Sequence, residues 1–127
     1  MKICITSEGM NLDSQVDPRF GRCRYFIIAD TDTLQFEAIE NPNLESMGGA
    51  GIQSAQLVAS KQAKAVVTGN VGPNAFATLQ AAGVEIFTNA SGTVKEAVEK
   101  YKKGGYTAVS GPSVGSHSGM PGKNRNK

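Results

Sequence analysis

Arginines cluster in one short segment of the chain. Three of the four arginines, Arg19, Arg22 and Arg24, lie within six residues of one another. A guanidinium group is a weakly hydrated cation with several N–H donors, so such a group can neutralise a phosphate or a metal–sulfur cluster. The same arginines could instead be solvated, or pair with Asp13 and Asp17. The spacing predicts an anion site with Arg19 and Arg22 as its candidates, because Arg24 falls at a predicted strand.

Cys23 lies between Arg22 and Arg24. Neighbouring positive charge lowers the pKa of a thiol and favours the thiolate, which is the form that ligates soft metals. The alternative is an unligated thiol at the start of a strand. The second cysteine, Cys4, falls inside an apolar run and is expected in the core. We expect no disulfide between the two, because disulfides are rare in the cytosol.

Two glycine-rich turns could offer backbone N–H groups to an anion. The sequence GNVGPN lacks the lysine and the spacing of a phosphate-binding loop, and GGAG is not a dinucleotide fingerprint. We expect these turns to contact a sulfide or oxide ligand through backbone N–H groups and two asparagine side chains. The candidate residues are Gly48, Gly49 and Gly51 in one turn, and Asn70, Gly72 and Asn74 in the other.

The hydrophobic pattern predicts eight elements that position these residues. The chain should begin with three strands, the second and third joined by a tight antiparallel hairpin at residues 31–33. Helices then alternate with strands, and Thr93 with Glu96 forms a capping box. The predicted strands are residues 2–7, 24–30, 34–40, 63–68 and 84–88, and the predicted helices run from 48–51 to about 62, from 72–73 to 83, and from 93 to 104.

Short loops and right-handed crossovers leave few ways to connect these elements. We expect an α/β fold of three layers, with a five-stranded mixed sheet of order 3-2-1-4-5 and helices on both faces. The arginine-bearing loop, both glycine turns and residues 89–93 then lie at one edge of the sheet. The N-termini of all three helices should point there, with unpaired N–H groups and partial positive charge. Such an edge suits an anion.

Composition restricts the class of protein. The 127 residues are 39% hydrophobic and carry a net charge of +2. The last five residues, KNRNK, supply three positive charges, so the remainder is nearly neutral and no nucleic-acid surface is expected. No apolar run is long enough for a membrane span, and the N-terminus does not resemble a signal peptide, so a cytoplasmic location is expected. Residues 1–109 should form one domain and residues 110–127 a flexible, basic, Gly/Ser-rich tail.

Catalysis is not expected. Metal-dependent nucleases need clustered carboxylates, whereas this edge offers only Glu8, Asp13 and Asp17 from a single loop. The one histidine, His117, falls in the predicted tail, so no Ser/His/Asp set can form around it. His117 together with Met120 could capture a soft metal, although a lone histidine in such a tail usually has no role.

Three motifs in order resemble the dinitrogenase iron–molybdenum cofactor biosynthesis family. They are residues 19–22 (RFGR) followed by Tyr25-Phe26, residues 48–51 (GGAG) followed by Ala55-Gln56, and residues 72–76 (GPNAF) with residues 82–84 (AGV). The resemblance covers about residues 1–108. It implies a ribonuclease-H-like fold and the binding or carriage of iron–molybdenum cofactor or its precursors. A related group of small proteins is similar in holding an anionic molybdenum–copper sulfide cluster.

The leading hypothesis is therefore a non-catalytic protein that binds, carries or helps to assemble an anionic metal–sulfur cluster. Its partners would be the cluster and proteins that donate or accept it. The first alternative is a module that binds a phosphorylated ligand or nucleotide at the same edge. The second is an interaction protein that docks a partner through a sheet edge or the tail.

Overall fold

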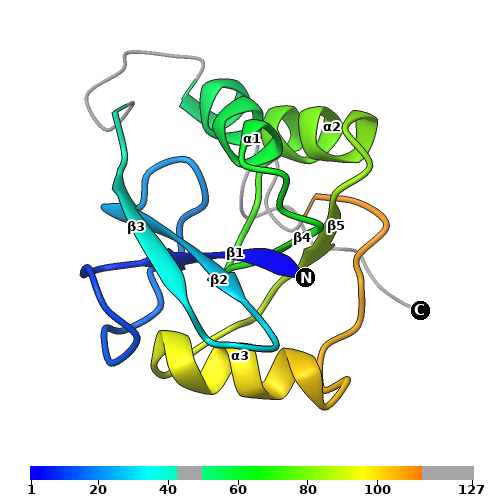
Figure 1. The fold of residues 1–127 in the computed structure, drawn as a ribbon. Coiled ribbons are helices and arrows are strands. Elements are labelled where there is room, and N and C mark those ends of the chain that lie inside the picture. The colour runs from blue at the N-terminus through cyan, green and yellow to red at the C-terminus, as the bar shows by residue number, and fades with distance from the viewer. Residues whose placement is uncertain (43–49, 113–127) are drawn as a thin grey trace.

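The computed structural model describes residues 1–42 and 50–112. Gly48 and Gly49 lie outside the described residues, as do His117 and Met120 in the predicted tail. Within the described ranges the chain forms five strands and three helices in the predicted order (Figure 1). The strands are β1 (Lys2–Ser7), β2 (Tyr25–Asp30), β3 (Phe36–Glu40), β4 (Ala65–Val67) and β5 (Glu85–Phe87), and the helices are α1 (Ala50–Ser60), α2 (Pro73–Ala81) and α3 (Val94–Lys102).

The strands form one mixed sheet of order β3-β2-β1-β4-β5, which confirms the predicted order. β1 pairs antiparallel with β2, and β2 pairs antiparallel with β3 through the predicted hairpin. β1, β4 and β5 run parallel. The carboxyl ends of these three parallel strands therefore meet at one edge of the sheet. We call it the upper edge below, a name that does not refer to its place in the figures.

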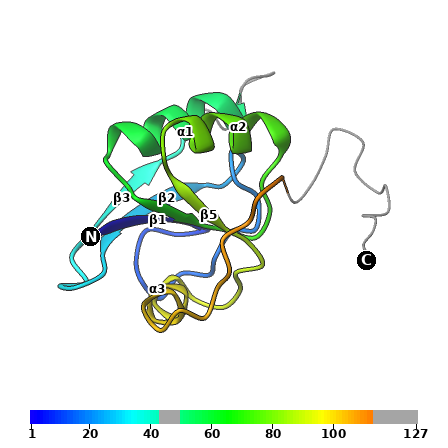
Figure 2. The ribbon, with the colours of Figure 1, turned by 90° about the vertical axis from the view of Figure 1, so that its right-hand side faces the viewer.

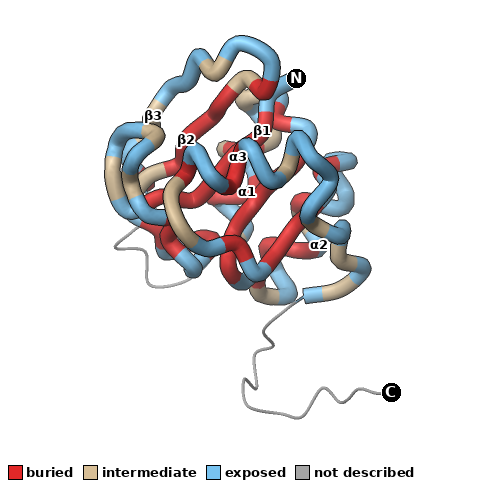
Figure 3. Tube along the Cα trace, turned by 90° about the horizontal axis from the view of Figure 1, so that it is seen from below, coloured by how far each residue is buried: buried red, intermediate tan, exposed pale blue. Residues whose placement is uncertain are grey.

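Helices cover both faces of the sheet (Figure 2). α1 and α2 pack on one face over a core that includes Cys4, Phe26 and Val66. α3 packs on the other face over a core that includes Ile3 and Ile5. Because side chains alternate along a strand, β1 feeds both cores, and its segment is buried through the centre of the molecule (Figure 3). The three-layer α/β architecture is thus as expected, while its classification as ribonuclease-H-like stays a prediction.

Residues at helix ends behave as their types predict. Gly72 precedes α2 with Pro73 at its first turn, and Gly83 follows α2 with a φ of +77°. Thr93 and Glu96 form the capping box of α3 through both reciprocal hydrogen bonds.

Two apolar residues are less buried than the sequence pattern predicts: Phe36 is 41% exposed and Ile52 is 37% exposed. Phe36 is the first residue of β3, an edge strand of the sheet in which no residue is fully buried.

Among the described residues, none of the helices has the length and apolar character needed to span a bilayer. The C-terminal part of the described chain still contacts the sheet, because the N–H of Val109 donates to the carbonyl of Ile86 at 2.8 Å. The predicted boundary between residues 109 and 110 stays a prediction, since residues 113–127 lie outside the described ranges.

Candidate functional site

A cavity of about 220 Å³ opens at the upper edge of the sheet, where the loop after β1 meets the starts of α1 and α2. We call it the arginine-loop cavity. Four predicted site residues line it: Arg22, Gly51, Gly72 and Asn74. The remaining lining residues are Phe20, Gly21, Ala50, Pro73 and Ala75. Residues from three separate segments of the sequence therefore converge on one space.

The start of α2 supplies hydrogen-bond donors to this cavity. Gly72 is extended, with φ −83° and ψ 175°, and no side chain caps the helix. Pro73 has no N–H, and the first amide bonded in the helical pattern is that of Phe76, which donates to the Gly72 carbonyl at 2.9 Å. No acceptor among the described residues meets the N–H groups of Asn74 and Ala75. These groups and the helix dipole make the cavity wall electropositive.

Close backbone packing sets the width of the cavity. A Cβ atom on Gly51 would lie 3.3 Å from the Cβ of Ala75, so α1 and α2 approach closely at their first turns. Gly21 has a φ of +94°, and a Cβ there would lie 3.2 Å from the Cα of Gly51. At Gly72, by contrast, a Cβ would meet no atom within 4 Å. Gly72 thus borders open space rather than protein.

Arg22 and Arg19 occupy different positions at the upper edge. Arg22 is exposed and lines the cavity. Arg19 is 64% exposed and pairs with Asp17, with 3.2 Å between Nε and Oδ1, as the alternative interpretation of this loop allowed. The hydrogen bond to Asp17, and then its charge, raise the pKa of Arg19. Arg19 and Asn70 form a backbone bridge to each other, but neither lines the cavity.

The expected activation of Cys23 is wrong. Its side chain is fully buried, and burial raises its pKa to about 12, with a further increase from the negative charge of Asp17. The lowering effect of Arg19 is smaller than these two causes. Cys4 is also a buried free thiol, and burial raises its pKa well above the usual range. The sequence pattern showed the flanking arginines, but not the apolar packing that outweighs them.

The first N–H groups of α3 are already hydrogen-bonded within the protein. This corrects the expectation that all three helix N-termini offer unpaired N–H groups to a ligand. The N–H of Val94 donates to the carbonyl of Ser14 at 2.8 Å, and the N–H of Lys95 donates to the carbonyl of Leu12 at 2.9 Å. The next N–H, that of Glu96, is met by the hydroxyl of Thr93 at 3.1 Å. These donors hold the loop after β1 in place and are not available to a ligand.

Sequence reasoning missed several residues that shape the cavity. Phe20 is buried, and its ring lies 5.9 Å from that of Phe26 in an edge-to-face contact that anchors the loop. Gly21 and Ala75 allow the close approach of the backbone segments described above. The RFGR and GPNAF motifs contained all three residues, so the signal was present, but only Arg19, Arg22, Gly72 and Asn74 were chosen from these motifs.

The described residues contain no group of three or more His, Cys, Asp or Glu side chains that could hold a metal ion. The chemistry of the arginine-loop cavity is therefore that of N–H donors and positive charge. Such a set matches an anionic ligand held through its outer atoms, and it does not match a metal held by direct coordination to several side chains.

Comparison with known proteins gives a consistent result. The structure resembles the apo form of the orange protein from Desulfovibrio gigas, with 40% identity, a TM-score of 0.85 and coverage of 87% of this chain and 94% of that chain. It also resembles a putative NifB protein from Thermotoga, with 38% identity, a TM-score of 0.74 and coverage of 84% and 91%. An uncharacterized protein from Methanocaldococcus jannaschii is 26% identical over an alignment of 108 residues, with coverage of 82% of this chain and 92% of that protein.

The family profile described as dinitrogenase iron-molybdenum cofactor matches residues 1–104. This match extends from β1 through the end of α3 and includes every described residue of the arginine-loop cavity. The chain belongs to the dinitrogenase iron–molybdenum cofactor family.

Proposed function

We propose that this protein binds and carries a small anionic metal–sulfur cluster in the arginine-loop cavity. The cluster would be an iron–molybdenum cofactor precursor or a molybdenum–copper sulfide, and it would be cargo rather than a catalytic centre. One observation carries the proposal: Arg22 lines the same cavity as Asn74 and Ala75, whose N–H groups have no acceptor among the described residues. Family membership supports a cluster-related role, and one relative was determined in an apo form.

The residues present favour a particular way of holding the cluster. Arg22 would neutralise part of its charge, and the N–H groups at the start of α2 would bond to its outer sulfur or oxygen atoms. Gly51 and Gly72 would let the cluster approach the backbone closely. We assign Cys23 no coordinating role, because its side chain is fully buried and does not line the cavity. Arg19 and Asn70 lie at the same edge without an assigned contact, and the roles expected of Gly48 and Gly49 stay predictions, because both residues lie outside the described ranges.

Carriage rather than catalysis is part of this proposal. The partners would be proteins that donate the cluster and accept it, in the cytoplasm, and neither nucleic acid nor a membrane would take part. An open cavity at the surface suits such a transfer, because a ligand held by hydrogen bonds and charge can leave without breaking coordination bonds.

Anaerobic reconstitution tests the proposal. The apo-protein is mixed with tetrathiomolybdate and Cu(I), or with a cofactor precursor, and visible absorption is recorded after gel filtration. We expect a retained chromophore with the wild-type chain, and affinity about tenfold lower for Arg22→Gln. Arg24→Gln is the matched control, since Arg24 is also exposed but does not line the cavity.

Two results would count against the proposal. The first is a complete absence of retained chromophore with both types of cluster. The second is thermal stabilisation by nucleotides or inorganic phosphate, lost in Arg22→Gln, without any stabilisation by clusters. The second result would establish the phosphate-binding alternative at the same cavity.

A further inference from the structure

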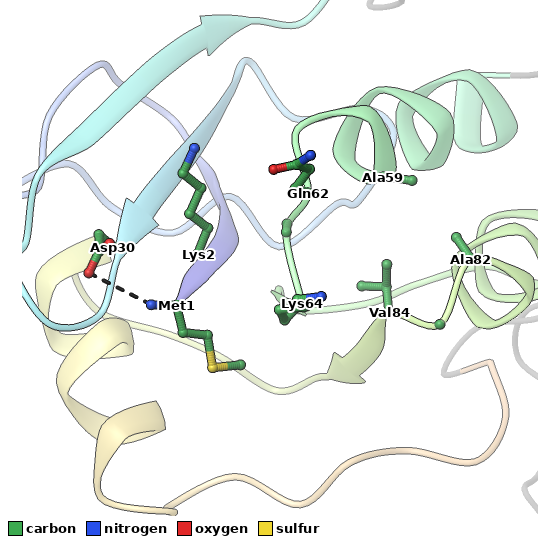
Figure 4. A pocket seen from close by; sticks show the side chains of 10 residues that line it. Met1, Lys2, Asp30, Ala59, Gln62, Lys64, Ala82 and Val84 are labelled. Atoms are coloured by element: carbon green, nitrogen blue, oxygen red, sulfur yellow. Dashed lines mark ion pairs between the residues drawn. The ribbon is translucent and has the colours of Figure 1, made fainter.

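A second and larger cavity, of about 690 Å³, lies at the opposite edge of the sheet, where the parallel strands begin and α1 and α2 end. We call it the lysine cavity, after Lys2 and Lys64 in its lining (Figure 4). Its volume falls in the range of small-molecule pockets, roughly 300–1,000 Å³. None of the residues predicted for cluster binding lines it.

Lys2 and Lys64 are held next to each other by the sheet. The N–H of Lys64 donates to the carbonyl of Lys2 at 2.8 Å, in continuation of the parallel pairing of β1 with β4. Cys4 and Val66, two residues further along each strand, both face α1 and α2. Because strand side chains alternate, Lys2 and Lys64 lie on that same face. Like charges on neighbouring strands are unfavourable unless an opposite charge offsets them.

The described part of the chain offsets this charge only in part. No carboxylate there forms an ion pair with Lys2 or Lys64. The one carboxylate of the lining, Asp30, has its pKa lowered mainly by hydrogen bonds from the backbone N–H groups of Asp32 and Thr33, and further by the charges of the Met1 amino group and Lys2. Asp30 lines the cavity, but one of its oxygens accepts the N–H groups of Asp32 and Thr33 at 2.8 and 3.2 Å. The same oxygen lies 3.9 Å from the amino group of Met1 (Figure 4). The lysine cavity is therefore a site of excess positive charge.

The ends of α1 and α2 do not remove this excess. Helix C-termini carry partial negative charge on unbonded carbonyl groups. Here the chain itself bonds to carbonyls of both last turns: the N–H of Gln62 donates to Ala59 at 3.0 Å, and the N–H of Val84 donates to Leu79 at 3.0 Å. These bonds weaken the attraction that the helix ends offer to the lysines.

The rest of the lining adds an apolar surface and one amide. Ala59, Ala63, Ala82 and Val84 contribute small apolar groups. The side chain of Gln62 comes from the turn between α1 and β4 and borders the same space as Lys2 and Lys64 (Figure 4). Its amide can donate and accept hydrogen bonds. A ligand that fits needs a negative group for the lysines and a short apolar body for the alanines.

We propose that the lysine cavity binds a small organic anion, with one carboxylate or phosphate group held by Lys2 and Lys64 and a short hydrocarbon or aromatic body over Ala59, Ala63 and Ala82. This binding is independent of cluster binding in the arginine-loop cavity, because the two cavities share no lining residue and lie at opposite edges of the sheet. The protein thus has a second site for a ligand of a different chemical class.

Amide chemical shifts of the ¹⁵N-labelled full chain test the proposal, with butyrate, phenyl phosphate and inorganic phosphate as probes. We expect saturable shifts at Ala63 and Gly83 with an organic probe, and affinity about tenfold lower in the double variant Lys2→Gln/Lys64→Gln. Ala82→Leu, at an exposed position that borders the cavity, should weaken binding by filling it. Inorganic phosphate, which lacks the apolar body, should bind at least about tenfold more weakly than phenyl phosphate.

Lys61→Gln is the matched control, since Lys61 pairs with Glu37 at 3.2 Å and does not line the cavity. Its affinity should stay within about twofold of wild type. Three results would overturn the proposal: no saturable shift with either organic probe up to about 20 mM, equal affinity in the double lysine variant, or equal affinity for inorganic phosphate and phenyl phosphate. None of these results bears on cluster binding, which is read from visible absorption.

Discussion

The buried carboxylate of Asp17 holds the exposed Arg19 from two directions. Oδ1 of Asp17 accepts the backbone N–H of Arg19 at 3.1 Å and its side-chain Nε–H at 3.2 Å. Asp17 is 1% exposed, whereas Arg19 is 64% exposed. The bond to the backbone N–H fixes the turn at Arg19, and the bond to Nε fixes the orientation of the Arg19 side chain at the upper edge.

Replacing Asp17 should therefore affect folding more than replacing its partner. Asp17→Ala leaves the Arg19 N–H without its acceptor, and we expect a loss of about 1–3 kcal/mol in the free energy of unfolding. Arg19→Gln keeps the bond from the backbone N–H to the buried Asp17 carboxylate and removes only the contact made by the exposed side chain, so it should cost less than about 1 kcal/mol. Urea denaturation measures both changes. Equal effects of the two substitutions would contradict this account of the loop.

Gly69 and Pro18 provide a test of how the loop is seated on the sheet. A Cβ on Gly69 would lie 2.6 Å from the Cα of Pro18, which is backbone and has little freedom to move. Gly69→Ala should destabilise the fold by about 1–3 kcal/mol. Gly72→Ala is the control, because a Cβ there meets nothing within 4 Å, and its effect should stay within about 1 kcal/mol. Thermal unfolding that ranks the two variants the other way would refute this packing.

An aspartate at position 72 should separate folding from cluster binding. Position 72 is the N-cap of α2 and has no side chain to cap the helix. Gly72→Asp should raise the unfolding free energy by about 0.5 kcal/mol, because aspartate caps the helix and complements its dipole. The same carboxylate adds negative charge to the cavity wall, so retention of tetrathiomolybdate and copper should fall about tenfold or more.

Gly72→Ser serves as the neutral counterpart, since serine also caps a helix but carries no charge. It should bind the cluster more tightly than Gly72→Asp. If both variants bound the cluster equally well, the proposal that the start of α2 recognises the cluster by its charge would be wrong.

The raised pKa of Cys23 predicts a dependence of stability on pH. Burial raises this pKa to about 12 in the folded chain, whereas the pKa of a thiol in an unfolded chain is about 8.5. The contribution to stability is therefore fully present below about pH 8.5 and is lost as the pH rises towards the folded value. In that window, one such thiol lowers the free energy of unfolding by roughly 1.4 kcal/mol for each rise of one pH unit.

Urea denaturation between pH 7 and pH 10 should show this decline, and Cys23→Ala should make it shallower whatever its effect on overall stability. Cys4 shares the behaviour, so Cys4→Ala should reduce the slope as well. An unchanged slope in Cys23→Ala would mean that Cys23 is not the buried thiol described here.

Local pattern and chain connectivity were enough to predict the architecture. The alternation of apolar residues in residues 2–7 and the capping box at Thr93 are local signals, and both elements form where expected. The strand order followed from short loops and right-handed crossovers, which act on any chain with this order of elements. The same reasoning brought Arg22, Gly51, Gly72 and Asn74 to one edge, and the structure brings these four into one cavity.

The remaining properties depend on contacts between distant segments. The pKa of Cys23 is set by burial within a core built from both ends of the domain, which a charge pattern of three adjacent residues does not reveal. The closed start of α3 depends on Leu12 and Ser14, about eighty positions earlier in the chain. The exposure of Phe36 follows from the position of β3 at the side of the sheet, although its alternating pattern is typical of a half-buried strand.

Gly51 and Ala75 carry the two smallest side chains available to a protein, and they stand where the two helices come nearest. Gly51 cannot become smaller, whereas either residue can be replaced by a larger one. Enlargement would push the helices apart and widen the opening while the sheet stayed the same. If the cavity holds the proposed cluster, the sizes of the residues at positions 51 and 75 therefore set how large an anion it admits.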